Sequence, residues 1–170
     1  TGSDEIARVA REVDAVLADP AIDHIAVPKR ALALIGPGIW GVTAREGALK
    51  LRESAHVLAE GFDSETLLHG AAVPLGSEDV LVGLQPQADQ DGLTGLLLAA
   101  AGAEGITTYE LDARSAAGSP AQTFLAQITL TVRLQLLAAR FSQARGTNPD
   151  KVITGAWARD ELWSTGALRE

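Results

Sequence analysis

Short apolar runs alternate with helix-like segments along this chain, and this alternation restricts its fold more than any other feature. A continuous apolar run at 31–35 has the length and composition of a buried strand, and we predict further strands at 80–84 and 106–111. Apolar residues at helical spacing predict helices over residues 4–17, 44–58, 93–103 and 121–144. Alternating strands and helices favour a parallel sheet with helices on both faces. We therefore predict an α/β fold, a three-layer sandwich formed by one domain over residues 1–170.

The helix predicted over 44–58 has two different faces. Apolar residues recur at steps of four and three on one stripe, namely Ala44, Ala48, Leu51, Ala55 and Leu58. Charged residues occupy the opposite stripe, namely Glu46, Lys50, Glu53 and Glu60. His69 follows after a polar turn, and together these groups could move protons on a polar substrate. The simpler interpretation is a solvated face, because Glu46–Lys50 and Lys50–Glu53 have the spacing of helix ion pairs.

The segment from Glu46 to Gly70 supports the first interpretation. It reads E-G-A-L-K-L-R-E-S-A-H-V-L-A-E-G-F, and L-L-H-G follows at 67–70. This signature resembles the sugar isomerase (SIS) domain, and it is most similar to the C-terminal SIS half of the isomerase module of glucosamine-6-phosphate synthase. Weaker similarity occurs at 134–138 and 145–151, in the family's order. The resemblance implies a flavodoxin-like sandwich with five strands, of which only three are recognisable here.

The resemblance gives roles to three residues. Glu53 matches the family glutamate that moves a proton between C1 and C2 of an open-chain phosphosugar, and partial burial would raise its basicity. Lys50, one helical turn earlier, would hold the developing negative oxygen. His69 lies sixteen positions after Glu53 and matches the histidine that opens the sugar ring, with a polar cap after a loop as the alternative. In the family this histidine reaches a neighbouring subunit's site, which implies a homodimer or a tandem pair of SIS halves.

The turn before this helix, at 36–41, fits the G-x-G-x-x-G pattern of dinucleotide-binding proteins. That fingerprint also needs a second strand ending in an acidic residue about twenty residues on, where we predict helix followed by a turn at 60–62. We therefore favour a tight turn in which Gly36 and Gly38 bring backbone N–H groups near a ligand or the start of the helix; in the resemblance this turn borders the sugar pocket. Further candidates for substrate contacts are Glu46, Glu60 and Glu65, although Glu46 and Glu60 also suit helix pairing.

Several positions depart from the family pattern. Ala71 stands where the family has proline, Thr66 replaces a glutamate, and Trp157 falls by spacing at a lysine that helps bind the open-chain sugar. Residues 85–89 read Q-P-Q-A-D, which cannot cradle a phosphate through hydroxyl groups. In the resemblance the hydroxyl-rich phosphate loop belongs to a first SIS half. This chain is therefore expected to bind sugar phosphate as one half of a site and to be nearly inactive alone.

Two functions of different classes are compatible with these observations. The first is aldose–ketose isomerisation of a sugar phosphate, or the linked amino transfer or deamination, with this chain as the second SIS half. The second is a non-catalytic SIS domain that senses phosphosugars or mediates dimerisation. The spacing between Glu53 and His69 favours the enzyme, whereas the departures at Thr66 and Trp157 favour the second function.

Composition narrows the class of partner. A net charge of −8 and a pI near 4.8 argue against nucleic acid as a ligand. The sequence has no run of eighteen apolar residues and no signal-peptide pattern, so we expect no membrane contact and a cytoplasmic protein. Cysteine is absent and no histidine–carboxylate cluster has metal spacing, so neither a metal nor a cofactor is expected.

The two ends of the chain indicate a larger unit. The sequence contains no methionine and begins with residues 1–3, T-G-S, which we interpret as a tag scar, a trimmed terminus or a cut within a longer protein. Residues 146–170 are predicted to form an extended polar tail. Trp157 and Trp163 in this tail suggest that it docks against another subunit or domain.

Overall fold

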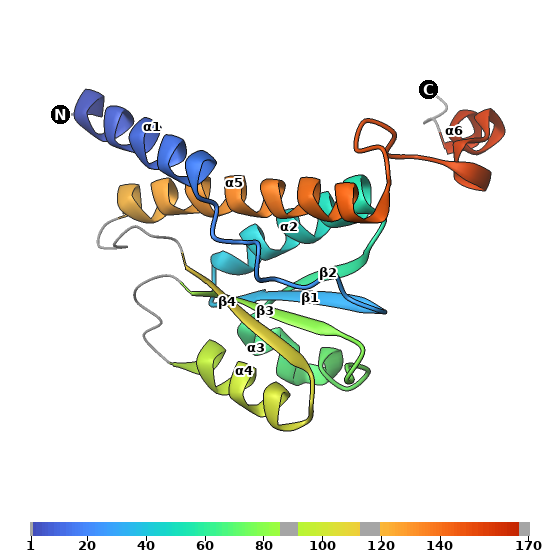
Figure 1. Ribbon diagram of the computed structural model, residues 1–170, viewed down its shortest axis with the longest axis horizontal. Coiled ribbons are helices and arrows are strands. Elements are labelled where there is room, and N and C mark those ends of the chain that lie inside the picture. Colours follow the sequence, from blue (N-terminus) through green and yellow to red (C-terminus); the bar gives the residue numbers. More distant parts are fainter. Residues whose placement is uncertain (1, 86–91, 113–119, 167–170) are drawn as a thin grey trace.

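A parallel sheet between two helical layers forms the body of the protein (Figure 1). The computed structural model describes residues 2–85, 92–112 and 120–166. Its elements are, in order, α1 (Gly2–Ala18), β1 (Ala31–Gly36), α2 (Trp40–Ala55), β2 (Leu58–Asp63), α3 (Ser64–Thr66), η1 (Leu67–Ala71), β3 (Val80–Gln85), α4 (Leu93–Ala103), β4 (Thr107–Asp112), α5 (Pro120–Arg145), η2 (Gly155–Ala158) and α6 (Asp160–Gly166).

The described strands form one sheet in the order β2-β1-β3-β4, and every pair in it is parallel. In the register of the inner strands, Ile35 lies opposite Phe62 of β2 and opposite Gly83 of β3. Because all strands point the same way, their last residues meet at one edge, where Gly36 aligns with Asp63. The predicted α/β sandwich with a parallel sheet flanked by helices is therefore confirmed.

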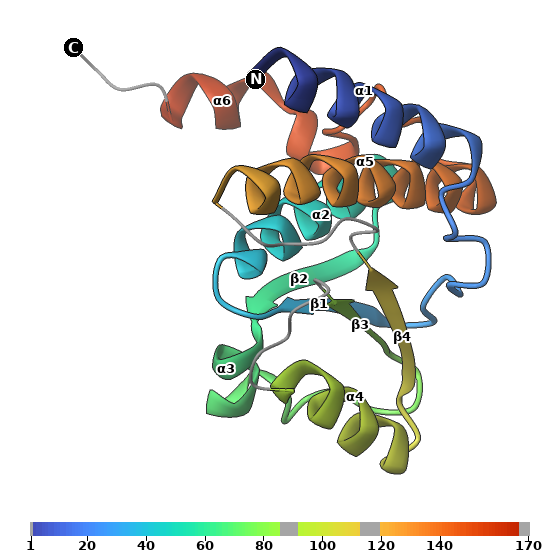
Figure 2. The same cartoon turned by 90° about the vertical axis from the view of Figure 1, so that its left-hand side faces the viewer.

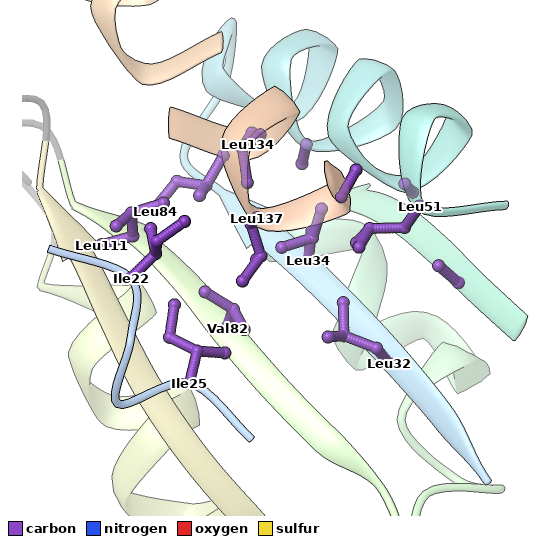
Figure 3. Packing of buried hydrophobic residues seen from close by; sticks show 14 of the residues in the cluster. Ile22, Ile25, Leu32, Leu34, Leu51, Val82, Leu84, Leu111, Leu134 and Leu137 are labelled. Carbon is purple, nitrogen blue, oxygen red and sulfur yellow. The ribbon is translucent and has the colours of Figure 1, made fainter. Parts of the chain in front are cut away.

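Alternate residues of the strands face different helical layers. Leu32 and Leu34 pack with α2 and α5, whereas Ala33 and Ile35 pack with η1 and α4. Figure 3 shows the first of these clusters, in which side chains from α2 and α5 meet those of β1 and β3. In Figures 1 and 2, α1 lies on the outer side of α5, away from the sheet.

The helix predicted over 44–58 is wrong at both ends. Helix α2 begins at Trp40 and ends at Ala55, because His56 adopts the left-handed conformation (φ 51°) and donates its N–H to the carbonyl of Leu51. Strand β2 then occupies residues that were predicted as helix and turn. Leu58 continues the apolar spacing of the helix, but this residue is 62% exposed at the edge of the sheet.

Strand β2 lies unusually close to helix α2 at one point. A Cβ atom added to Gly61 would lie less than 3.0 Å from the backbone of Ala44 and Arg45. Glycine is therefore required here by the close approach of two main chains. This contact fixes the height of α2 above the sheet, and α2 carries three of the predicted site residues, Glu46, Lys50 and Glu53.

The remaining predicted elements agree with the structure to within a few residues, and the polar tail also contains the short helix α6. Of the five strands that the resemblance implies, four occur within the described ranges. Residues 86–89 of the Q-P-Q-A-D segment lie outside the described residues, as do residues 113–119 between β4 and α5. Within the described part of the chain, no helix is long and apolar enough to cross a membrane.

Candidate functional site

A cluster of three charged side chains lies on the outward face of α2. Lys50 Nζ is 2.8 Å from Glu53 Oε2 and 3.7 Å from Glu46 Oε1. These side chains are 33%, 28% and 41% exposed for Lys50, Glu53 and Glu46, so each is partly covered yet reachable from solvent. The i,i+3 and i,i+4 spacing therefore brings together three of the four charged residues that the sequence pattern placed on this stripe.

The cluster keeps Lys50 positively charged. Its hydrogen bond to Glu53 raises the pKa of Lys50 above its ordinary value, burial opposes this, and the negative charges of Glu53 and Glu46 add to the rise. At neutral pH the ammonium group can therefore stabilise an adjacent negative oxygen, and it cannot act as a base. Within this cluster, a carboxylate is the group able to accept a proton.

Glu46 also lines an open groove of about 490 Å³ between α2 and α5. Val42 and Thr43 line the same groove from α2, and Phe124 and Gln127 face them from α5. Gln127 Nε2 donates hydrogen bonds to Ile39 O and Thr43 Oγ1 at 3.3 Å, which ties the two helices together beside the groove. The polar cluster thus continues into a hollow that mixes apolar walls with amide, hydroxyl and carboxylate groups.

The backbone N–H groups at the glycine turn before α2 already form hydrogen bonds within the turn. The N–H groups of residues 40, 41 and 42 donate to carbonyls of residues 37, 38 and 39 at 3.0–3.1 Å. A Cβ at Gly36 would lie 2.7 Å from Trp40 Cβ, and Gly38 has a positive φ of 52°. The turn therefore needs these glycines for its own geometry, whether or not they also border a ligand.

His69 lies in another layer of the protein. It is exposed in η1, whose Leu67 packs with Ala33 and Ile35 on the sheet face opposite to α2. The helix is kinked at this point, because His69 has φ −83° and ψ 38° and Gly70 has φ 103°. Interruptions of this kind are frequent at functional sites. Within one chain, however, the sheet separates His69 from Glu53.

The other predicted site residues lie on β2 and α3. Glu60 belongs to an edge strand, so its interpretation as a helix-pairing residue is wrong; its Oε2 is 3.8 Å from Arg52 Nη1 across the helix–strand contact. Glu65 is exposed on α3, four residues before His69. The structure therefore brings Glu65 and His69 to the same short helical segment, apart from the cluster on α2.

The sequence argued against a dinucleotide site because no strand ending in an acidic residue was predicted about twenty residues after the glycine turn. The structure does contain such a strand, because β2 ends in Asp63. Both carboxylate oxygens of Asp63 are already engaged, because Thr66 donates its N–H to Oδ1 at 2.9 Å and its hydroxyl to Oδ2 at 2.6 Å. These bonds lower the pKa of Asp63 and make it the N-terminal cap of α3.

Two further features complete the chemistry of the described residues. Among them, no group of three or more His, Cys, Asp or Glu side chains is arranged to hold a metal ion.

A further hollow, which the sequence analysis did not predict, lies at the C-terminal end of α2, where His56 faces the segment after α5. No sequence pattern marks this hollow, because it depends on how residues 146–157 return to α2.

Comparison with known proteins relates the sequence of this chain to one part of longer isomerising aminotransferases. No protein-family model matches the chain. The glutamine–fructose-6-phosphate aminotransferase (isomerizing) of Thermococcus kodakarensis is 31% identical over 161 residues, which cover 87% of this chain and 27% of that protein. The chain spans only 20–27% of the length of the curated relatives it matches.

Solved structures show the same fold. The C-terminal domain of glucosamine-fructose-6-phosphate aminotransferase from Francisella tularensis superposes with a TM-score of 0.69 at 25% identity, covering 85% of this chain and 45% of that one. A protein of Escherichia coli, solved in complex with a sugar phosphate, has a TM-score of 0.69 at 15% identity. The matched region covers 85% of this chain and 89% of that protein.

Proposed function

Because this chain is a SIS domain related to the C-terminal isomerase domain of glucosamine–fructose-6-phosphate aminotransferase, we propose that it binds an open-chain sugar phosphate as the second half of an aldose–ketose isomerase or aminotransferase-like protein. The cluster of Glu46, Lys50 and Glu53 is the observation that carries this proposal. It supplies a carboxylate and a fixed cation beside an open groove, in a chain with detectable identity to isomerising enzymes over most of its length.

The chemistry follows from the contacts of these two side chains. Glu53 takes the proton from C1 of the ketose, the C–H electrons form the C1–C2 double bond, and the carbonyl oxygen becomes an enediolate oxygen. Lys50 stabilises that negative oxygen while it exists. The hydroxyl proton on O1 then moves to the negative oxygen on C2, and a C1–O1 double bond forms as the electrons of the C1–C2 double bond take the proton from Glu53 at C2. The product is the aldose, with no atom or electron gained or lost overall.

His69 acts in this proposal from a second SIS domain. The sheet separates His69 from Glu53 within one chain, so one site can contain both only if it is shared between two domains. The exposed position of His69 beside a kinked turn suits a group that reaches out to a neighbour and opens the sugar ring. The Escherichia coli protein in complex with a sugar phosphate, most of whose length this chain matches, supports sugar-phosphate binding by a protein of about this size.

A non-catalytic domain that senses phosphosugars or mediates dimerisation is the second candidate. Two departures from the family pattern favour it. Thr66 is committed to the cap formed with Asp63, and Trp157 is 74% exposed at a position where the family has a lysine. In this function the cluster on α2 would bind the sugar without moving a proton.

One pair of measurements separates the two candidates. The protein at its full natural length is titrated with fructose 6-phosphate in a calorimeter, and its isomerisation is followed in a coupled assay. Glu53→Gln should slow isomerisation by about 10²–10⁴-fold, because general-base catalysis contributes that much. Its affinity should stay near that of the wild type, because the amide keeps the size of the carboxylate.

Glu12→Gln provides a matched control, since Glu12 forms an ion pair with Arg8 on α1, away from the cluster. Its turnover and affinity should equal those of the wild type. Equal loss of turnover and affinity in Glu53→Gln would indicate a structural role for Glu53 and contradict the proposed base. Binding by the wild type without any turnover would identify the sensing domain instead.

A further inference from the structure

The edge of the sheet at β2 is an exposed surface with an apolar centre. Strand β2 is the last in the order of the described sheet, and Leu58 in it is largely exposed. Leu58 and Phe62 line a hollow of about 320 Å³ there, together with Ala71 of η1 and Pro74. We propose that a second copy of this chain docks on this edge, about a two-fold axis that runs along the strands. The inference rests on the proposed function, because it starts from a site shared between two domains.

Symmetry restricts where such a shared site can form. In a pair related by a two-fold axis, each copy uses the same surface for the contact. A site that takes Glu53 from one copy and His69 from the other therefore needs both residues at that one surface. Helix α2 with Glu53 and η1 with His69 lie on opposite faces of the sheet, so the surface has to pass around a border of the sheet.

The β2 edge is a border at which the two faces meet. Ala59 of β2 packs in the cluster that contains α2, whereas Phe62 packs against the cluster that contains η1. Helix α2 ends at Ala55, shortly before β2 begins, and Ala71 at the end of η1 lines the hollow with Leu58. The last turns of α2 and η1 therefore lie at the same end of β2. Figure 2 shows α2 and α3, which leads into η1, on opposite sides of this strand.

The opposite edge of the described sheet is covered by the segment before β1. Ala26 donates its N–H to the hydroxyl oxygen of Tyr109 in β4 at 3.2 Å. The ring of His24 also packs edge-on against the ring of Tyr109, with 5.6 Å between the ring centres. Of the two edges, β2 is therefore the one that leaves its strand open to a second copy.

The direction of the axis decides which groups meet. An axis along the strands turns one copy over relative to the other, so that α2 of one copy lies on the same side as η1 of its partner. Equal residues then stand at equal heights, and the two Leu58 side chains come close to the axis. An axis perpendicular to the sheet would place α2 beside α2, and Glu53 and His69 would stay apart. The proposed axis is the one compatible with a shared site.

The charges around Leu58 suit a copy of the same chain. Arg30 lines the hollow with Glu60, and Glu60 lies 3.8 Å from Arg52 across the helix–strand contact. A patch that carries both signs can pair reciprocally with itself, although the whole chain has a net charge of −8. An apolar centre with a polar rim is also the usual composition of an interface.

Side chains rather than added strands make the proposed contact. Arg52 donates to the carbonyl of Ala59 at 2.5 Å, so one main-chain acceptor of β2 already has a partner. Charged side chains along an edge strand are a common device against pairing with a further strand. The two sheets therefore meet through Leu58 and its neighbours, without forming one continuous sheet.

The test exploits the absence of cysteine from these 170 residues. The natural-length protein with Leu58→Cys is treated with a short bismaleimide, and the product is digested and analysed by mass spectrometry. A covalent dimer should form, in which two peptides containing residue 58 are joined. Leu96→Cys on α4 and Phe124→Cys on α5 are similarly exposed and should give no such dimer. The protein without an added cysteine, treated in parallel, reports any linkage from outside this region.

A second pair of variants measures the strength of the contact by sedimentation equilibrium. Leu58→Glu brings two negative charges together at the axis and should weaken dimerisation by about 100-fold. Leu96→Glu adds the same charge on α4 and should dimerise like the wild type. Both leucines are exposed, so the circular dichroism spectra of both variants should equal that of the wild type.

The interface and the proposed function fail in different ways. A missing cross-link at Leu58, a wild type that sediments as a monomer, or unchanged dimerisation of Leu58→Glu would each overturn the interface. Continued binding of fructose 6-phosphate in that case would leave the proposed function intact. A protein that cross-links at Leu58 and does not bind fructose 6-phosphate would overturn the proposed function alone.

Discussion

Replacing Gly61 with alanine tests the packing that positions α2. The added Cβ would lie less than 3.0 Å from backbone atoms of Ala44 and Arg45, which cannot rotate away as a side chain could. Ordinary contacts begin near 3.4 Å, so β2 and α2 must move apart to admit the methyl group. Overpacking of this kind costs about 2–3 kcal/mol. For a chain of this size the melting temperature should fall by about 4–12 °C.

Gly95→Ala provides a control of opposite sign. Gly95 lies inside helix α4, and a Cβ there would meet only Gln85 Nε2, at 3.8 Å. Alanine in a helix interior should therefore stabilise the protein by about 0.5–1 kcal/mol. The two substitutions add the same methyl group, so their difference isolates the close approach of β2 to α2.

Both variants are measured by urea unfolding followed by circular dichroism, with equal m-values as the condition for comparing them. Gly61→Ala should also weaken sugar-phosphate binding, because any shift of α2 displaces the cluster of Lys50 and Glu53. A free energy of unfolding for Gly61→Ala within about 0.5 kcal/mol of the wild type would refute the reasoning, since surface substitutions away from special features fall within that range.

Three further substitutions test other parts of the account. Burial acts to raise the pKa of Asp79, but hydrogen bonds from Arg30 and two backbone N–H groups outweigh it and leave that pKa lowered. The stability that Asp79 contributes should be complete above the unfolded pKa of about 3.9 and lost as the pH falls through the lower folded value. Asp79→Asn should lower the free energy of unfolding by about 2–3 kcal/mol at pH 7. Urea unfolding of this variant should also show a smaller loss of stability at acid pH than that of the wild type. Gly70→Ala should cost about 1–3 kcal/mol in thermal unfolding, because its φ of 103° is unfavourable for alanine although the space around it is open. Lys50→Met should change stability by less than about 1 kcal/mol, since exposed ion pairs contribute little, yet slow isomerisation by about 10²-fold in the coupled assay.

The elements that local sequence could specify were predicted, and those that depend on neighbours were not. The runs at 31–36 and 80–85 are buried on both faces, so their continuous apolar composition marks them as strands. Strand β2 lies at the sheet edge, where Leu58 is exposed and Gly61 is needed because α2 comes so close. Its sequence therefore lacks the continuous apolar composition of a buried strand. Helix α2 ends where His56 adopts the left-handed conformation. A positive φ is uncommon for residues other than glycine, so the sequence did not indicate this end.

The same distinction applies to the candidate site. Lys50 and Glu53 share one helix, and helical spacing was enough to predict that they meet. The position of His69 depends on which face of the sheet η1 packs against, and nothing in the local sequence fixes that choice. The hollow beside Trp157 depends on the path of the tail back to α2, which is a tertiary property.

Mixing two inactive variants tests most directly whether Glu53 and His69 meet in a site shared between two SIS domains. Glu53→Gln and His69→Ala are unfolded or dissociated together, reassembled, and assayed for isomerisation of fructose 6-phosphate. In a symmetric pair, each mixed assembly contains one site with both side chains intact, so the mixture should recover about a quarter of the wild-type activity. A mixture as inactive as its two components, under conditions where the wild type reassembles with full activity, would contradict the account.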